Sequence, residues 1–185
     1  MDVPRELVAR VRAGGFALLL TGPPGRGKTT HLLALAAGLP GAPLVRVPLE
    51  GPPPTIPDAP LLLLDELHLL PPRTRAALLA RRPGLIATTH ADHTDELARA
   101  DLSWAAHAAG GLTPRAVVDR LAAIVERRLL WARRGPGPGP IVPRATLEVL
   151  VARHGDDLRA ILDVLYERVQ AMTSPGEIGP GEVRP

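Results

Sequence analysis

The chain has 185 residues, a formal net charge of +3 and no cysteine. This length suffices for one hydrophobic core with a small additional domain, but not for two large domains. The absence of cysteine excludes disulfide bonds, thiolate zinc sites and cysteine nucleophiles. No stretch approaches the roughly 18 apolar residues of a membrane span, and residues 1–12 lack the apolar centre of a signal peptide, so we expect a cytoplasmic protein without membrane contact.

The basic residues are arginines with one exception, Lys28. The arginines are densest in segments 73–82 and 127–134, which are the candidate contacts for nucleic acid. A net charge this small supports such a partner only weakly. Few aromatic side chains are present, which argues against a platform for stacking single-stranded bases.

The single lysine lies in a glycine-rich segment, residues 22–29, that matches the phosphate-loop pattern G-x-x-x-x-G-K-[ST]. The apolar run 16–21 before it predicts a buried strand, and residues 29–37 predict a helix that Gly38 ends. In this order the backbone N–H groups would surround a phosphate, Lys28 would bridge the β and γ oxygens, and Thr29 would bind Mg²⁺. We therefore expect ATP and Mg²⁺ as ligands, with nucleotide contacts from Gly22, Pro23, Pro24, Gly25, Arg26, Gly27, Lys28, Thr29 and Thr30.

Further along the chain, segments that predict strands alternate with connections. Residues 44–49 predict an edge strand because Pro48 lacks the N–H that a central strand would donate. The proline-rich segment 51–60 predicts an extended crossover, and residues 61–64 predict a second buried strand. A helix over 72–82, a strand over 85–89 and a last strand near Trp104 follow. This alternation predicts a parallel sheet covered by helices.

Two acidic residues, Asp65 and Glu66, follow the buried strand 61–64 directly. An aspartate at the carboxyl end of such a strand can hold Mg²⁺, and the neighbouring glutamate can orient and deprotonate an attacking water molecule. We therefore predict Asp65 as a metal ligand, with Thr29, and Glu66 as a catalytic residue.

The strand 85–89 ends in Thr88, Thr89 and His90 at the same edge of the predicted sheet. We predict Thr89 as a group that contacts the γ-phosphate or the attacking water, with His90 as a weaker candidate. His90 and His93 have the spacing i, i+3, but this pair is more typical of a polar loop than of a metal site. The other histidines show no ligand spacing.

The last third of the chain predicts a small helical domain. Thr113 and Pro114 form a helix start, and the apolar residues up to Trp131 keep helical spacing. Helices over 144–154 and 156–171 follow a Gly/Pro loop at 135–140. We expect a nucleotide-binding α/β core at 1–112, a helical lid at 113–172 and a disordered tail at 173–185.

In their order along the chain, the four motifs resemble those of the AAA+ ATPases. Residues 22–29 resemble Walker A, residues 61–66 Walker B, residues 86–90 sensor 1, and residues 155–159 sensor 2, with the lid pattern of clamp-loader and initiator types. The resemblance implies a P-loop three-layer sandwich with a parallel sheet of order 5-1-4-3-2, a helical lid, and contact of Arg159 with the γ-phosphate. It also implies an arginine finger, for which Arg99 is the best candidate.

These features predict an ATPase that hydrolyses ATP with Mg²⁺, forms homo-oligomers, and assembles or remodels an unidentified protein partner, in DNA transactions if the lid pattern is a guide. The Pro-rich segment 51–60 stands where the family has a helix, so we do not expect substrates to be threaded through a pore. Two alternatives remain open at this point: a P-loop kinase of a small acceptor, and an interaction switch with very slow hydrolysis.

Overall fold

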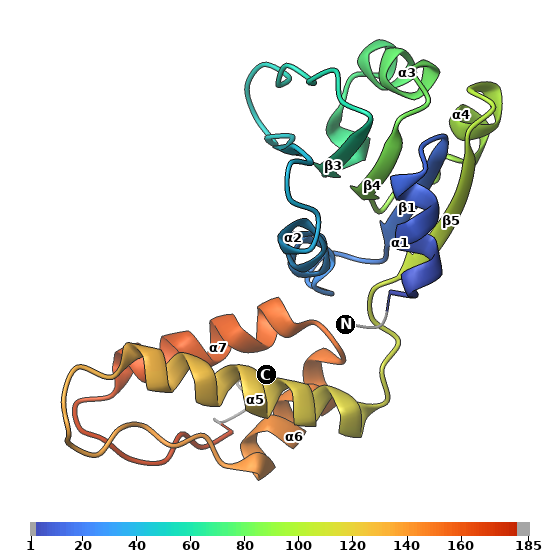
Figure 1. Cartoon of the computed structure of the whole chain (residues 1–185). Helices are drawn as coiled ribbons and strands as arrows, with labels where there is room; N and C mark the ends of the chain where they lie inside the picture. The colour runs from blue at the N-terminus through green and yellow to red at the C-terminus, as the bar shows by residue number, and fades with distance from the viewer. Residues whose placement is uncertain (1–2, 181–185) are drawn as a thin grey trace. The chain divides into compact units, whose positions relative to one another are not determined.

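The computed structural model describes residues 3–180, which form two compact units divided between Ala109 and Gly110. The first unit is built on a five-stranded sheet in which every pairing is parallel (Figure 1). The strand order is β2-β3-β4-β1-β5. Read from the other edge this is 5-1-4-3-2, so the predicted sheet order is confirmed. The strands are β1 (Phe16–Thr21), β2 (Leu44–Arg46), β3 (Leu61–Asp65), β4 (Gly84–Thr88) and β5 (Ser103–Ala108).

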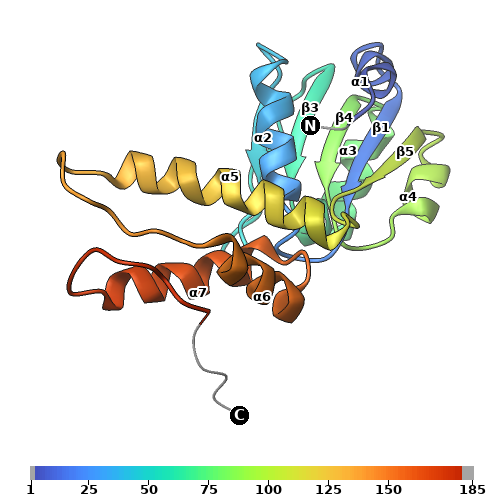
Figure 2. The same cartoon turned by 90° about the horizontal axis from the view of Figure 1, so that it is seen from below.

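Helices cover both faces of this sheet and give the predicted three-layer sandwich (Figure 2). Alternate residues of a strand point to opposite faces. Leu18 and Leu20 of β1 therefore pack with α1 (Arg5–Arg12) and α2 (Lys28–Ala37). Leu19, on the other face, packs with α3 (Pro72–Ala80) and α4 (Thr94–Arg99). The three central strands are buried on both faces, as their uninterrupted apolar sequences predict.

Two features of this unit differ from expectation. The edge strand β2 ends at Arg46 instead of Leu49, and Pro48 explains this because it cannot donate to a neighbouring strand. Helix α1 was not predicted. It packs so closely on β4 that a side chain at Gly84 would place its Cβ 2.0 Å from the carbonyl oxygen of Val11. No helix lies between β2 and β3, as the proline-rich sequence predicts.

The second unit consists of α5 (Pro114–Ala132), α6 (Arg144–His154) and α7 (Leu158–Ala171), which share one apolar core (Figure 1). Side chains cap two of the helices: Thr113 accepts a hydrogen bond from the Ala116 N–H, and Asp157 accepts one from the Ala160 N–H. Helix α6 ends at Gly155, whose φ of 61° suits glycine. The start of α7 at Leu158 lies two residues beyond the predicted start.

Residues 173–180 pack on this helical unit, which differs from the expected disordered tail. Ile178 is buried in its core, and the Thr146 hydroxyl donates a 2.8 Å hydrogen bond to the Ile178 carbonyl. The remainder of the expected tail, 181–185, lies outside the residues that the structure describes. Among the described residues, no helix has the length and apolar character needed to cross a membrane.

Candidate functional site

The loop between β1 and α2 takes a shape that its glycines make possible. Gly22 has a φ of 130°, and a Cβ on it would lie 2.6 Å from the Ala109 carbonyl oxygen. Gly27, with a φ of 82°, turns the chain into α2, which begins at Lys28. The free N–H groups of the first helical turn therefore lie in this loop, where they can bind an anion. Pro23, Pro24 and Thr30 are exposed, and Gly25 also has positive φ, at 79°.

Lys28 is held within this loop. Its side-chain ammonium donates hydrogen bonds of 2.8 Å to the Gly22 carbonyl and 2.9 Å to the Pro23 carbonyl, and the residue is 7% exposed. Burying an ammonium group is costly unless acceptors surround it. Phosphate oxygens are stronger acceptors than these carbonyls because they carry charge. The loop therefore fits a phosphate group.

The Thr29 hydroxyl lies 3.1 Å from the Asp65 Oδ1 atom and joins the loop to the end of β3. Asp65 is 2% exposed, and its Oδ2 atom accepts no hydrogen bond; its nearest charged partner is the Arg46 Nε atom at 3.6 Å. A buried carboxylate with an unused oxygen, next to a hydroxyl group, offers the hard oxygen ligands that Mg²⁺ prefers. These two residues fit the metal that the sequence predicts.

Thr88, the last residue of β4, also contacts Asp65, and sequence reasoning missed it. Its hydroxyl donates a 2.7 Å hydrogen bond to the Asp65 Oδ1 atom and accepts one of 2.8 Å from the Glu66 N–H. The register pairs Leu64 with Ala87, so the next residues on the two strands, Asp65 and Thr88, are neighbours. Thr88 thus fixes both acidic residues at this edge of the sheet.

Glu66 has a left-handed backbone conformation, with φ 65° and ψ 51°. Such conformations are unfavourable for residues other than glycine and are concentrated at functional sites. Its carboxylate lies 3.6 Å from the Nδ1 atom of His68, which belongs to the short helix η1 (Leu67–Leu69). Burial lowers the pKa of His68, and the charge of the neighbouring His90 lowers it further.

Thr89 directly follows β4, at the predicted edge of the sheet, but its side chain contacts other groups than expected. It is fully buried, and its hydroxyl bonds with Ala91 and, at 3.0 Å, with the Nε2 atom of His93. The other ring nitrogen of His93 lies 3.1 Å from Glu96, which forms a two-point ion pair with Arg75. We therefore correct the prediction for Thr89: its side chain belongs to a buried polar network, and Thr88 is the threonine that reaches the acidic residues.

The pKa values in this network are shifted by burial and by the ion pair. Burial lowers the pKa of His93, in spite of the opposing effect of Glu96. The hydrogen bond from Arg75 lowers the pKa of Glu96. Both shifts favour a neutral His93 beside an ionised Glu96 at neutral pH.

The two predicted arginine contacts are exposed residues. Arg99 ends α4 in the first unit, and Arg159 lies in the first turn of α7 in the second.

The arginine segment 73–82 is less available to nucleic acid than its sequence indicates. Three of its members form ion pairs: Arg75 with Glu96, Arg81 with Asp58 and Arg82 with Asp101.

Comparison with known proteins agrees with this architecture. A solved structure of PCH-2 from C. elegans superposes with a TM-score of 0.55 at 16% identity, over 95% of this chain and 60% of that chain. The two chains share their fold. A Bacillus subtilis DNA clamp loader delta protein matches with a TM-score of 0.32 at 11% identity, over 96% of this chain and 49% of that one, which is too low to carry an argument.

No family model matches the sequence, and no curated protein is similar to it. The chain spans about 60% and 49% of the two solved chains. At 16% identity the likeness to PCH-2 shows the fold alone. Function has to be argued from the site.

Proposed function

We propose that this chain binds ATP with Mg²⁺ and hydrolyses it, as an ATPase of the AAA+ type. The observation that carries the proposal is the contact between Thr29 and Asp65, 3.1 Å apart, at the carboxyl edge of the sheet. It places a hydroxyl group from the phosphate loop against a buried carboxylate from the neighbouring strand. This is the pair that holds Mg²⁺ in P-loop NTPases.

The residues of the loop divide the binding task. Lys28 would exchange its two carbonyl acceptors for phosphate oxygens, and the N–H groups at the start of α2 would supply further donors. Thr29 and Asp65 would hold Mg²⁺, which supplies positive charge against the phosphates during hydrolysis. Thr88 keeps the Asp65 carboxylate in place.

Glu66 is our candidate for the general base. It follows Asp65 directly, and its side chain is partly exposed, so a water molecule can reach it. A carboxylate in that position can orient the water and accept its proton. The strained backbone of Glu66 is held by the hydrogen bond from its N–H to Thr88. A kinase that transfers phosphate to an acceptor has no need of a water-activating carboxylate.

Hydrolysis in this account is linked to assembly. We propose that Arg159 contacts the γ-phosphate from the lid, and that Arg99 acts on the nucleotide of a neighbouring copy in a homo-oligomer. Arg99 is exposed, and among residues 3–180 its side chain has no ion pair or hydrogen bond. An arginine that is not engaged within its own chain is suited to act on another.

Replacement of Glu66 by Gln tests the assignment. We expect Glu66→Gln to retain ATP binding and to lower turnover by about 10²- to 10⁴-fold. Glu50→Gln is the matched control, because Glu50 is an exposed glutamate outside the site. Near-normal turnover in Glu66→Gln would refute Glu66 as the base. Phosphate transfer to an added acceptor, with little hydrolysis in its absence, would favour the kinase.

A further inference from the structure

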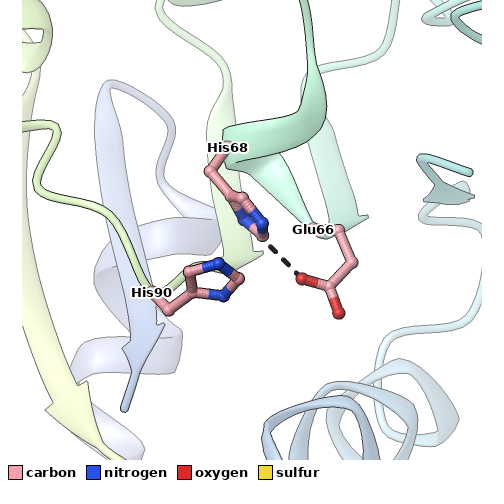
Figure 3. Close-up of side chains that lie close together, drawn as sticks. All are labelled: Glu66, His68 and His90. Atoms are coloured by element: carbon pink, nitrogen blue, oxygen red, sulfur yellow. Dashed lines mark ion pairs between the residues drawn. The ribbon is translucent and has the colours of Figure 1, made fainter. Parts of the chain in front are cut away.

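Glu66, His68 and His90 form a cluster of potential metal ligands at the carboxyl edge of the sheet (Figure 3). Their ligand atoms all lie within 4.8 Å of one another. Glu66 and His68 come from the turn after β3, and His90 follows the end of β4. Because β3 and β4 are neighbouring parallel strands, their ends bring together side chains that are more than twenty positions apart in the sequence.

His68 is the fixed member of this cluster. Its side chain is only 12% exposed, and its Nδ1 atom is buried without a hydrogen-bond partner. That atom points toward Glu66, whose carboxylate lies 3.6 Å away, as the dashed line in Figure 3 shows. Buried ring nitrogens nearly always have a hydrogen-bond partner, so an unbonded one beside a carboxylate indicates a missing bond.

Two members of the cluster can adjust around an ion, because His90 is exposed and Glu66 is partly exposed. The rings of His68 and His90 are tilted by 52° to each other, with centroids 3.7 Å apart. Zinc binds nitrogen and oxygen at about 2.0–2.2 Å, so its ligands lie roughly 3.3 Å from one another in a tetrahedral site. Rotation of the Glu66 and His90 side chains toward His68 would bring all three within that range.

We propose that Glu66, His68 and His90 bind a transition-metal ion of the Zn²⁺ class, with one coordination position left open. Two imidazoles and one carboxylate are the donor set that such ions prefer, whereas Mg²⁺ prefers oxygen ligands alone. The adjoining residues Asp65 and Glu66 therefore serve different ions. Asp65 pairs with the hydroxyl of Thr29, and Glu66 pairs with imidazoles.

The bound ion inhibits the ATPase. This second part rests on the proposed function, in which Glu66 accepts a proton from water. A carboxylate that coordinates a zinc ion is a much weaker base, because the cation withdraws electron density from its oxygens and repels an incoming proton. Zinc should therefore lower turnover without displacing ATP, since the ligands of the nucleotide, Lys28 and Thr29, do not belong to the cluster.

Metal binding can be measured without nucleotide, on the full chain without an affinity tag. We would titrate Zn²⁺ by calorimetry and Co²⁺ by visible absorption, because tetrahedral Co²⁺ with nitrogen and oxygen ligands has characteristic bands. The variants are His68→Gln and His90→Gln. The control is His107→Gln, since His107 lies on β5 outside the cluster.

We expect one Zn²⁺ per chain in the wild type and in His107→Gln, and at least about tenfold weaker binding in His68→Gln and in His90→Gln. Undiminished binding in both variants would overturn the site, as would the absence of binding in the wild type. These results do not depend on whether the chain hydrolyses ATP.

The inhibitory part is tested by the ratio of ATPase rates with and without Zn²⁺ at saturating Mg²⁺. We expect Zn²⁺ to lower the ATPase rate of the wild type by a factor at least about ten times larger than the factor for His68→Gln. If Zn²⁺ binds to the wild type but lowers the ATPase rates of the wild type and of His68→Gln by the same factor, the proposed inhibition is wrong, and the metal site itself remains supported. Circular dichroism of each variant would show that the fold is intact.

Discussion

The Thr88 hydroxyl donates a 2.7 Å hydrogen bond to the Asp65 carboxylate across the adjoining strands β4 and β3. The same hydroxyl accepts the N–H of Glu66, so one side chain positions both acidic residues of the candidate site. Thr88 is fully buried. It is a positioning residue, and its effect should be visible in both stability and metal dependence.

We expect Thr88→Val to raise the Mg²⁺ concentration needed for half-maximal ATPase activity and to lower the free energy of unfolding by about 1–3 kcal/mol. Valine keeps the shape of threonine but leaves the Glu66 N–H and the Asp65 carboxylate without their partner. Thr88→Ser retains the hydroxyl and should keep the wild-type Mg²⁺ dependence. Urea unfolding and a Mg²⁺ titration of the ATPase rate test this, and wild-type values for Thr88→Val would contradict it.

The buried histidines should make the protein less stable as the pH falls below about 6.5. The pKa of His93 is lowered in the folded state, as is that of His68, so the unfolded chain binds protons that the folded chain does not. Their contribution to stability is present above the unfolded pKa of about 6.5 and is lost as the pH falls toward the folded value. The slope can approach about 1.4 kcal/mol per pH unit for each histidine.

The lowered pKa of Glu96 acts in the same direction at more acidic pH. Its carboxylate is ionised beside Arg75, so its contribution is present above the ordinary glutamate pKa and is lost as the pH falls through the lowered one. Urea unfolding at several pH values would show both phases. His93→Asn should flatten the slope between pH 5 and 6.5, and an unchanged slope would show that His93 titrates normally.

Arg159→Ala should reduce the preference for ATP over ADP, since the proposed contact of Arg159 is with the γ-phosphate alone. The effect should appear even in a monomer, because the arginine belongs to the same chain as the nucleotide. Arg153→Ala is the control, as Arg153 is an exposed arginine of α6 in the same unit. Binding constants for the two nucleotides test this, and an unchanged ratio in Arg159→Ala would remove Arg159 from the site.

Arg99→Ala should leave ATP binding unchanged but abolish the rise of specific activity with protein concentration. Arginine fingers supplied by a neighbour contribute roughly 10³- to 10⁵-fold in the best measured systems. Mixing Arg99→Ala with Glu66→Gln should restore part of the activity, because mixed assemblies contain sites with both groups intact. Arg73→Ala, another exposed arginine, is the control. Activity strictly proportional to concentration in the wild type would favour a monomer.

The phosphate loop and the strands beside it could be predicted because their signals are local, whereas the sheet order was implied by the resemblance to the AAA+ ATPases. The pattern at 22–29 and the apolar runs before and after it need no long-range information, and the ends of α6 follow from Pro143 and Gly155. Helix α1 was missed because it has only eight residues, too few to show a clear helical spacing of apolar residues.

The contacts of the site were harder to predict because they depend on strand register. Two adjacent threonines, Thr88 and Thr89, stand at the carboxyl end of β4, and the sequence does not say which of them faces β3. The register assigns Thr88. His68 and His90 are far apart in the sequence, so no local pattern indicates that their rings lie together. The local spacing i, i+3 pointed to His93 as the neighbour of His90. His93 in fact packs on Thr89 and Glu96.

Binding of ATP by the loop around Lys28 can be measured by calorimetric titration of Mg²⁺–ATP into the wild type and into Lys28→Ala. We predict saturable binding of one nucleotide per wild-type chain and no measurable binding to Lys28→Ala, with Arg12→Ala, an exposed cation of α1, binding as the wild type does. Wild-type affinity in Lys28→Ala would contradict the account, because the ammonium that this loop surrounds would then have no part in nucleotide binding.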